Sequence, residues 1–212
     1  RDYKVTGVQT CALPIYNTAS AGNPCPTIDS TIITIVDAPG AEFSYNTPFC
    51  EGDINTFPIF IGNNFAGTFT ANPTGITFIS TSTGEIDLTS STPGTYTIYN
   101  NLAASGGCAS ALDSFEIVIN PIPTINVPNA GMVCEGSTIN LTPSTGGTWS
   151  STDPTVATVD NSGLVTGIAT GTTTVVFTDA VTGCSSNTAD GLITVNPIPT
   201  INVPNAGMVC EG

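Results

Sequence analysis

Apolar and polar residues alternate in short stretches along most of this chain. In residues 115–119, Phe115, Ile117 and Ile119 would share one face of a strand, opposite Glu116 and Val118. Glycine, proline, asparagine and aspartate separate the stretches, so the pattern predicts an all-β protein of short strands and turns. The predicted strands are residues 42–45, 57–61, 67–71, 77–80, 85–88, 95–99, 115–119, 137–142, 147–151, 156–159, 164–168, 172–178 and 192–195.

One long segment occurs twice, because residues 120–136 are identical to residues 196–212. Such a repeat indicates tandem domains. The expected parts are the C-terminal end of a preceding domain (16–38), two complete domains (39–121 and 122–197) and the start of a further, truncated repeat (198–212). The motif Asn-Pro-Ile-Pro at 120–123 and 196–199 predicts short, extended, proline-containing linkers.

Several motifs of the second complete domain resemble a known family. They are Trp149-Ser150-Ser151, Val156-Ala157-Thr158-Val159-Asp160, Gly163-Leu164-Val165-Thr166-Gly167 and Gly171-Thr172. Together they resemble the group 2 bacterial Ig-like domain of invasin- and intimin-type surface proteins. The strand spacing also fits an immunoglobulin-like sandwich. The flanking cysteines depart from the commonest form of that family. They resemble those of Ig/PKD-like repeats in very large Bacteroidetes surface proteins, as do residues 84–88 and 92–96 with lower specificity. The resemblance implies tandem immunoglobulin-like β-sandwich domains in an exported protein.

Residues 1–15 resemble the translation of a common short-read sequencing adapter, with Tyr3-Lys4 in the place of the sample index. We therefore interpret it as an adapter-derived artefact that is excluded from reasoning about the fold, a genuine N-terminal segment being the alternative. This segment contains Arg1 and Lys4, the only basic residues of a chain with 16 acidic residues and no histidine. Residues 16–212 therefore have no cationic side chain that could neutralise phosphates, so no binding to nucleic acid is expected. The sequence also lacks an apolar stretch of the ~20 residues that span a membrane, so direct membrane insertion is not expected.

Each complete domain has one cysteine near its start, Cys50 or Cys134, and one before its last strand, Cys108 or Cys184. We predict the disulfides Cys50–Cys108 and Cys134–Cys184, which imply an oxidising compartment. Buried free thiols are the alternative. A metal site is less favoured, because histidine and the Cys-x-x-Cys spacing are absent. The remaining cysteines are Cys25 and Cys210, expected to be orphans of truncation, and Cys11 in the adapter-like segment.

Candidate catalytic chemistry is sparse in this sequence. Serine and threonine have no histidine to activate them. Two carboxylate pairs, Glu51 with Asp53 and Glu85 with Asp87, have a spacing that fits the solvent face of a strand better than a glycosidase site. We therefore expect neither catalysis nor a cofactor.

Ligand-binding candidates are also few. Asp153, Asp160, Asp190 and Asn161 offer oxygen ligands suited to Ca²⁺, but their spacing is looser than that of a dedicated site, so calcium is a weak alternative to turn and cap roles. Trp149, the single tryptophan, is predicted to lie in the core, the alternative being a platform for a sugar ring. Because Tyr96 and Tyr99 are three residues apart on one strand, only one of them can face the core.

These observations predict a non-catalytic segment of tandem Ig-like domains in a large bacterial cell-surface or secreted protein, with a structural or adhesive role. The expected partner is an extracellular ligand, such as a glycan or the surface of a host or neighbouring cell. One alternative is an accessory array that spaces a secreted enzyme from the cell or binds polysaccharide for it. Another is a calcium-dependent adhesive array.

Overall fold

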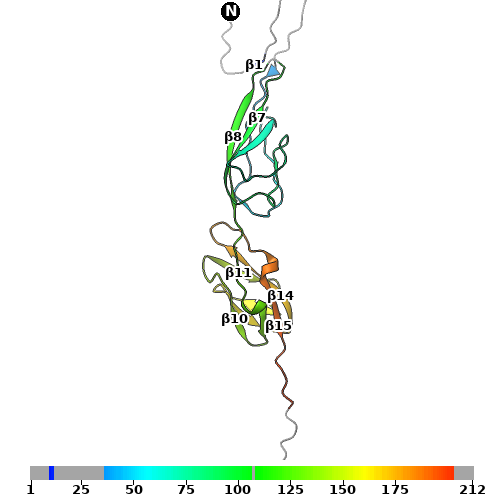
Figure 1. Cartoon of the computed structure of the whole chain (residues 1–212), viewed down its shortest axis with the longest axis vertical. Coiled ribbons are helices and arrows are strands. Elements are labelled where there is room, and N and C mark those ends of the chain that lie inside the picture. Colours follow the sequence, from blue (N-terminus) through cyan, green and yellow to red (C-terminus); the bar gives the residue numbers. More distant parts are fainter. Residues whose placement is uncertain (1–9, 12–35, 107, 203–212) are drawn as a thin grey trace, which may run out of the picture. The chain divides into compact units, whose positions relative to one another are not determined.

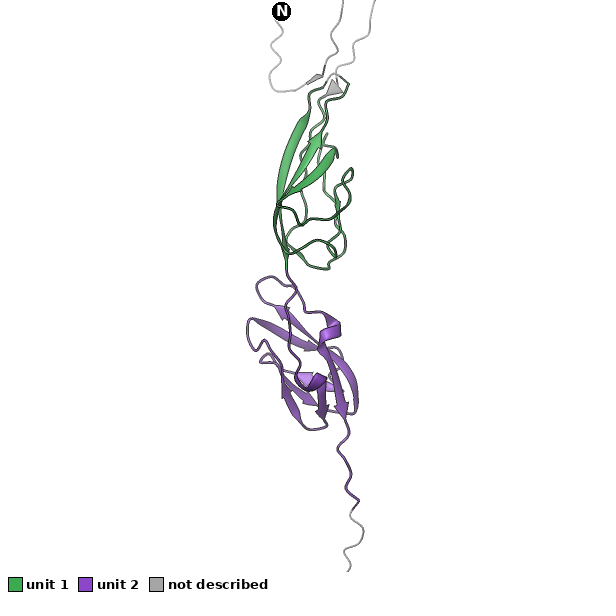
Figure 2. Ribbon diagram, viewed as in Figure 1, with its two compact units in different colours: residues 1–120 green, residues 121–212 purple. Residues whose placement is uncertain are grey.

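The computed structural model describes residues 10–11, 36–106 and 108–202. The chain divides into two compact units, residues 1–120 and 121–212 (Figures 1 and 2). Nearly all regular structure in the described residues is strand, with two 3-10 turns in unit 2, η1 (Pro128–Gly131) and η2 (Thr188–Gly191). None of these described helical turns is long and apolar enough to cross a membrane.

Unit 1 is built around a long antiparallel hairpin. Its four-stranded sheet has the order β3 (Phe49–Cys50), β8 (Ala111–Asn120), β7 (Gly94–Leu102) and β4 (Thr68–Asn72). Strand β3 runs parallel to β8, whereas the other pairs are antiparallel. The short pairs are β5 (Phe78–Ser80) with β6 (Glu85–Ile86), and β1 (Thr10–Cys11) with β2 (Val36–Asp37).

Period-two alternation places one face of β7 and β8 in the core of unit 1. Tyr96 and Ile98 on β7 are buried together with Ile117 and Ile119 on β8. Tyr99 is only half-buried, in agreement with the prediction that the two tyrosines face opposite sides of the strand. The rest of this core consists of apolar side chains from other segments, namely Phe43, Tyr45, Phe49, Phe69, Ile86 and Leu88.

Two of the strands predicted for unit 1 do not form as continuous strands. Residues 42–45 and 57–61 meet only through the isolated bridge between Ser44 and Ile59, and a second bridge joins Gly40 to Asn64. The prediction was wrong here because alternation alone does not provide a ladder partner. Pro58 has no N–H to donate to a ladder.

Unit 2 is a sandwich of two sheets. The first sheet has the order β11 (Gly147–Ser151), β14 (Gly171–Asp179), β15 (Leu192–Asn196) and β9 (Met132–Cys134). The second has the order β10 (Thr138–Asn140), β13 (Leu164–Gly167) and β12 (Ala157–Val159). The core between them contains Val133, Ile139, Leu141, Trp149, Ala157, Val165, Val175, Phe177, Ile193 and Val195.

Parallel pairing of the outermost strand sets the direction of the chain through each unit. In unit 2, β9 runs parallel to β15, with Cys134 opposite Asn196. In unit 1, β3 runs parallel to β8, with Cys50 opposite Asn120. Each unit therefore receives the chain at one end, here called the upstream end, and releases it at the other, the downstream end.

Candidate functional site

The structure places the four predicted disulfide cysteines at the ends of the two sandwiches. Cys50, Cys108 and Cys184 are disulfide-bonded, so the prediction that this chain carries disulfides is confirmed. Cys134, however, is an exposed free thiol. The predicted pair Cys134–Cys184 is therefore wrong.

The pairing register of the strands explains why Cys134 and Cys184 cannot bond to each other. It excludes the predicted pair Cys50–Cys108 for the same reason. Cys184 lies at the upstream end of unit 2, where its carbonyl accepts a 2.9 Å hydrogen bond from the N–H of Asp179. Cys134 lies beyond the opposite end of β14, and the length of that strand separates the two by roughly 27 Å. In unit 1, Cys50 pairs with the last residue of β8, whereas Cys108 precedes its first residue, about 30 Å away. A disulfide needs Cα atoms within about 7 Å, so the geometry permits neither predicted pair. Cys25, Cys210 and most of residues 1–15 lie outside the described residues.

Trp149 lies in the core of unit 2, with 6% of its surface exposed. Its indole N–H donates a 2.9 Å hydrogen bond to the carbonyl of Pro143, and its ring centroid is 5.2 Å from that of Phe177. The ring face that a sugar platform would have to offer to solvent is therefore covered by protein.

Aspartates close several turns of both units with their side chains. Asp160 Oδ1 accepts hydrogen bonds from the N–H of Ser162 and of Leu164, both at 2.9 Å, and from the Ser162 hydroxyl at 2.6 Å. The Ser162 hydroxyl and the Leu164 N–H hold the pKa of the Asp160 carboxyl below its usual value. Asp153 is held in the same way by the hydroxyl and N–H of Thr155, which lower the pKa of its carboxyl.

Asp87 and Asp179 have the same role, which was not predicted for either residue from the sequence. Hydrogen bonds from Thr89 and Ser90 lower the pKa of Asp87, and hydrogen bonds from Thr182 and Val181 lower that of Asp179. The available signal was an aspartate followed two or three residues later by serine or threonine, the pattern of an Asx or ST turn.

These turns do not bring the calcium candidates together. Asp153 follows β11, Asp160 and Asn161 lie between β12 and β13, and Asp190 lies in η2. Among the described residues, no group of three or more histidine, cysteine, aspartate or glutamate side chains could hold a metal ion. The carboxylate pairs are also engaged locally, since Asp53 Oδ2 accepts a 2.7 Å hydrogen bond from the N–H of Cys50 and Asp87 closes its own turn.

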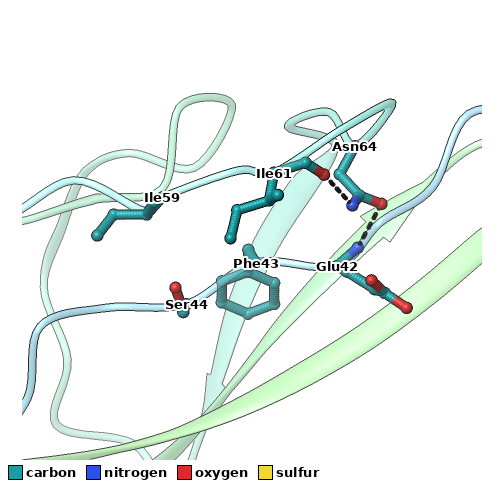
Figure 3. Close-up of a pocket in the computed structure, with 6 residues that line it drawn as sticks. All are labelled: Glu42, Phe43, Ser44, Ile59, Ile61 and Asn64. Carbon is teal, nitrogen blue, oxygen red and sulfur yellow. Dashed lines mark hydrogen bonds between the residues drawn. The ribbon is translucent and has the colours of Figure 1, made fainter.

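A shallow cavity of about 170 Å³ lies on unit 1 between residues 42–44 and 59–64 (Figure 3). Its lining residues are Glu42, Phe43, Ser44, Ile59, Ile61 and Asn64. The Asn64 side chain holds the two segments together, because its Oδ1 accepts a 3.2 Å hydrogen bond from the N–H of Glu42 and its Nδ2 donates to the carbonyl of Ile61. Half of the lining is apolar (Phe43, Ile59 and Ile61), and the polar half contains one carboxylate, Glu42.

Exposed apolar side chains continue from this cavity along residues 54–65, here called the 54–65 strip. They are Ile54, Phe57, Ile59, Ile61 and Phe65, of which Ile54 and Ile61 are 91% and 77% exposed. Apolar residues that gather on a surface commonly mark a contact site. The sequence did not reveal this site, because residues 57–61 were predicted to form a strand.

Comparison with known proteins found one family model that matches part of unit 2. The model of the bacterial Ig-like domain (group 2) matches residues 137–189, which confirms the resemblance found in the sequence. With the two sandwiches described above, this match confirms the predicted class, tandem immunoglobulin-like β-sandwich domains. A search of the curated proteins found no match.

Three of the solved structures found to be similar to this chain are an intimin fragment, a surface layer protein and an insect immune protein. The C-terminal 282-residue fragment of intimin, in complex with the intimin-binding domain of the translocated intimin receptor, is 20% identical with a TM-score of 0.42. The match covers 74% of this chain and 64% of that fragment, so the chain spans less than two thirds of its length. Domains 1–6 of the surface layer protein SbsC are 17% identical (TM-score 0.27, 84% of this chain and 25% of that one). The insect immune protein hemolin is 16% identical (TM-score 0.30, 86% and 49%).

Proposed function

We propose that this chain is a non-catalytic segment of an extracellular array of Ig-like modules, in a bacterial cell-surface or secreted protein, where it acts as a stalk with adhesive capacity. The observation that carries the proposal is the parallel pairing of the outermost strand in each unit. Because the chain comes in at one end of a sandwich and leaves at the other, each module adds its own length to the chain. A module whose termini met at one end would add little reach.

The repeated segment supports the same proposal. Residues 120–136 join unit 1 to unit 2 and then form β9, the strand that sets the direction of unit 2. The identical residues 196–212 follow β15. The sequence element that builds one module therefore recurs in the position needed to build the next.

Surface chemistry suits an exposed role. The described residues contain no lysine, arginine or histidine, so their acidic side chains have no cationic side chain to pair with. Their acidic residues stay uncompensated, and like charge keeps neighbouring fibres apart. Residues 5–212 contain no lysine or arginine and therefore no cleavage site for trypsin.

Surface labelling of intact cells of the source organism tests the proposal. An antibody raised against the purified chain should label unpermeabilised cells. The label should survive trypsin, which lacks a target here, and disappear after proteinase K, which cleaves without needing a basic residue. Label that is seen only after permeabilisation would overturn an extracellular role.

A second candidate function, binding of polysaccharide on behalf of a secreted enzyme, is favoured by one observation, the 54–65 strip with its adjoining cavity. Affinity electrophoresis in gels that contain soluble polysaccharides tests it. Retardation by one polysaccharide that is lost in Ile61→Ser would support this role. Val181→Ser, which changes a residue 92% exposed on unit 2, is the matched control and should keep the retardation. Equal mobility in all gels would remove the second candidate.

A further inference from the structure

The cysteines of both units follow one spatial rule. Cys50 and Cys134 each lie at the downstream end of a unit, opposite the residue after which the chain leaves, Asn120 or Asn196. Cys108 and Cys184 lie at the upstream ends, Cys108 in the loop between β7 and β8, and Cys184 in the loop before η2 and β15. Each unit thus carries one cysteine at each end, too far apart to bond to each other.

Bonding status differs between the two downstream-end cysteines. Cys50 is disulfide-bonded, whereas Cys134 is an exposed free thiol. The two occupy equivalent positions, since Phe49-Cys50-Glu51-Gly52 and Val133-Cys134-Glu135-Gly136 each end a strand that runs parallel to the last strand of the unit. The position itself is therefore compatible with a disulfide, and Cys134 differs from Cys50 in lacking a partner within reach.

We infer that Cys134 forms a disulfide with the upstream-end cysteine of the module that follows it in the array, the residue equivalent to Cys184. This inference rests on the array of the proposed function and adds a covalent bond between successive modules. The following module is marked by residues 196–212, which repeat the linker and β9 of unit 2.

Chain length allows this bond. In unit 2 the incoming linker is tied by the bridge between Asn126 and Thr142, and the N–H of Ala180 donates a 2.9 Å hydrogen bond to the carbonyl of Gly146. The linker and Cys184 therefore meet at the same end of the sandwich. In the next copy the residue equivalent to Asn126 is Asn202, six residues after Asn196, which is opposite Cys134. A chain of that length spans at most about 20 Å, so the linker is short enough to keep the two cysteines within reach of each other.

Bond formation is an oxidation with a defined balance. The two thiols lose two protons and two electrons as the S–S bond forms. A thiol–disulfide oxidoreductase of the oxidising compartment accepts the electrons, and its own disulfide is reduced to two thiols through a mixed disulfide. The consequence for the array is a second covalent connection parallel to each proline-containing linker, which limits bending between modules.

The test extends the natural chain by one module. Because residues 196–212 equal 120–136, continuing after Gly212 with the sequence of residues 137–197 completes a further copy of unit 2. Both chains are produced in an oxidising periplasm, labelled with a maleimide under native conditions, and mapped without reduction after pepsin digestion at low pH. In the natural chain Cys134 should take the label. In the extended chain the label should leave Cys134 and be found on Cys210, the new downstream-end cysteine.

The mapped peptides then decide between outcomes. A disulfide-linked peptide that joins Cys134 to the appended copy of Cys184 supports the inference. Cys134→Ser in the extended chain is the control, and it should leave the appended upstream-end cysteine free to take the label. Continued labelling of Cys134 in the extended chain, or a Cys134–Cys184 peptide within unit 2, would overturn the inference. Either result leaves the surface-labelling test of the array unaffected, so the two proposals fail separately.

Discussion

The hydroxyl of Tyr96 donates a 2.8 Å hydrogen bond to the carbonyl of Thr92, four residues earlier, and lies 2.8 Å from the Thr92 hydroxyl. This arrangement joins the start of β7 to the turn before it. Tyrosines near the start of a late strand make this contact in immunoglobulin-like sandwiches, where it is called the tyrosine corner. The ring of Tyr96 is buried, so its hydroxyl contributes to unit 1 both by packing and by closing the turn.

Replacing Tyr96 with phenylalanine should destabilise unit 1 by about 1–2 kcal/mol, because the Thr92 carbonyl loses its partner. Tyr99→Phe, on the opposite face of the same strand, is the matched control and should change stability by less than about 0.5 kcal/mol. Urea unfolding followed by far-UV circular dichroism measures the effect. Trp149 fluorescence reports unit 2 in the same samples, and its midpoint should stay constant. Equal shifts for both tyrosine variants would contradict a role for the corner hydrogen bond.

Trp149→Ala should destabilise unit 2 by about 3–5 kcal/mol, since it leaves a cavity against Phe177 and removes the hydrogen bond to Pro143. If Trp149 were instead an exposed platform for a sugar, the same substitution would destabilise unit 2 by less than about 0.5 kcal/mol. Urea unfolding by circular dichroism distinguishes the two, because only the transition of unit 2 should move to lower urea. A variant as stable as the original chain would show that the indole is not part of the core.

Acid should weaken unit 2 through Asp160. Its carboxyl has a lowered pKa in the folded unit because the Ser162 hydroxyl and the Leu164 N–H bind the ionised form. The resulting stabilisation is complete above the unfolded pKa, about 3.9, and is lost as the pH falls through the lower folded value. Asp160→Asn should therefore reduce the urea midpoint of Trp149 fluorescence at pH 7, and the difference from the original chain should shrink below about pH 4. The control Asp190→Asn changes another exposed carboxylate of the same unit. If the urea midpoints of Asp160→Asn and the original chain differed by the same amount at every pH, the role of the ionised Asp160 carboxylate would be contradicted.

Calcium should leave the stability of unit 2 unchanged. The carboxylates of Asp153 and Asp160 are occupied by their own turns, and Asp190 lies in a separate one. The measurement compares the melting midpoint of Trp149 fluorescence in excess chelator and in millimolar Ca²⁺. Magnesium at the same concentration controls for ionic strength. A calcium-specific rise in the midpoint would favour the calcium-dependent array instead.

The sequence by itself determined the class of fold and most of the strands of unit 2. The predicted strand at residues 147–151 coincides with β11. Those at 156–159, 164–168 and 192–195 differ from the observed strands by one residue at one end, and that at 172–178 by one residue at each end. Alternation and turn residues are local properties of the chain, so they can be interpreted without knowing what a strand pairs with. The turn at Asp160–Gly163 is an example, since Gly163 has a φ of +81° that glycine adopts without strain.

Only the tertiary structure decided the features that depend on how strands pair, namely on their register and their relative direction. Short strands β3 and β9 were not predicted, yet their parallel pairing with β8 and β15 places Cys50 and Cys134 at the downstream ends. The sequence order, one cysteine early and one late in each domain, is compatible with a disulfide inside the domain. The length of a single strand rules that disulfide out. Similarly, the pattern of apolar residues in 57–61 fits both a core strand and an exposed apolar strip. The structure shows the exposed strip, because residues 57–61 have no continuous ladder partner.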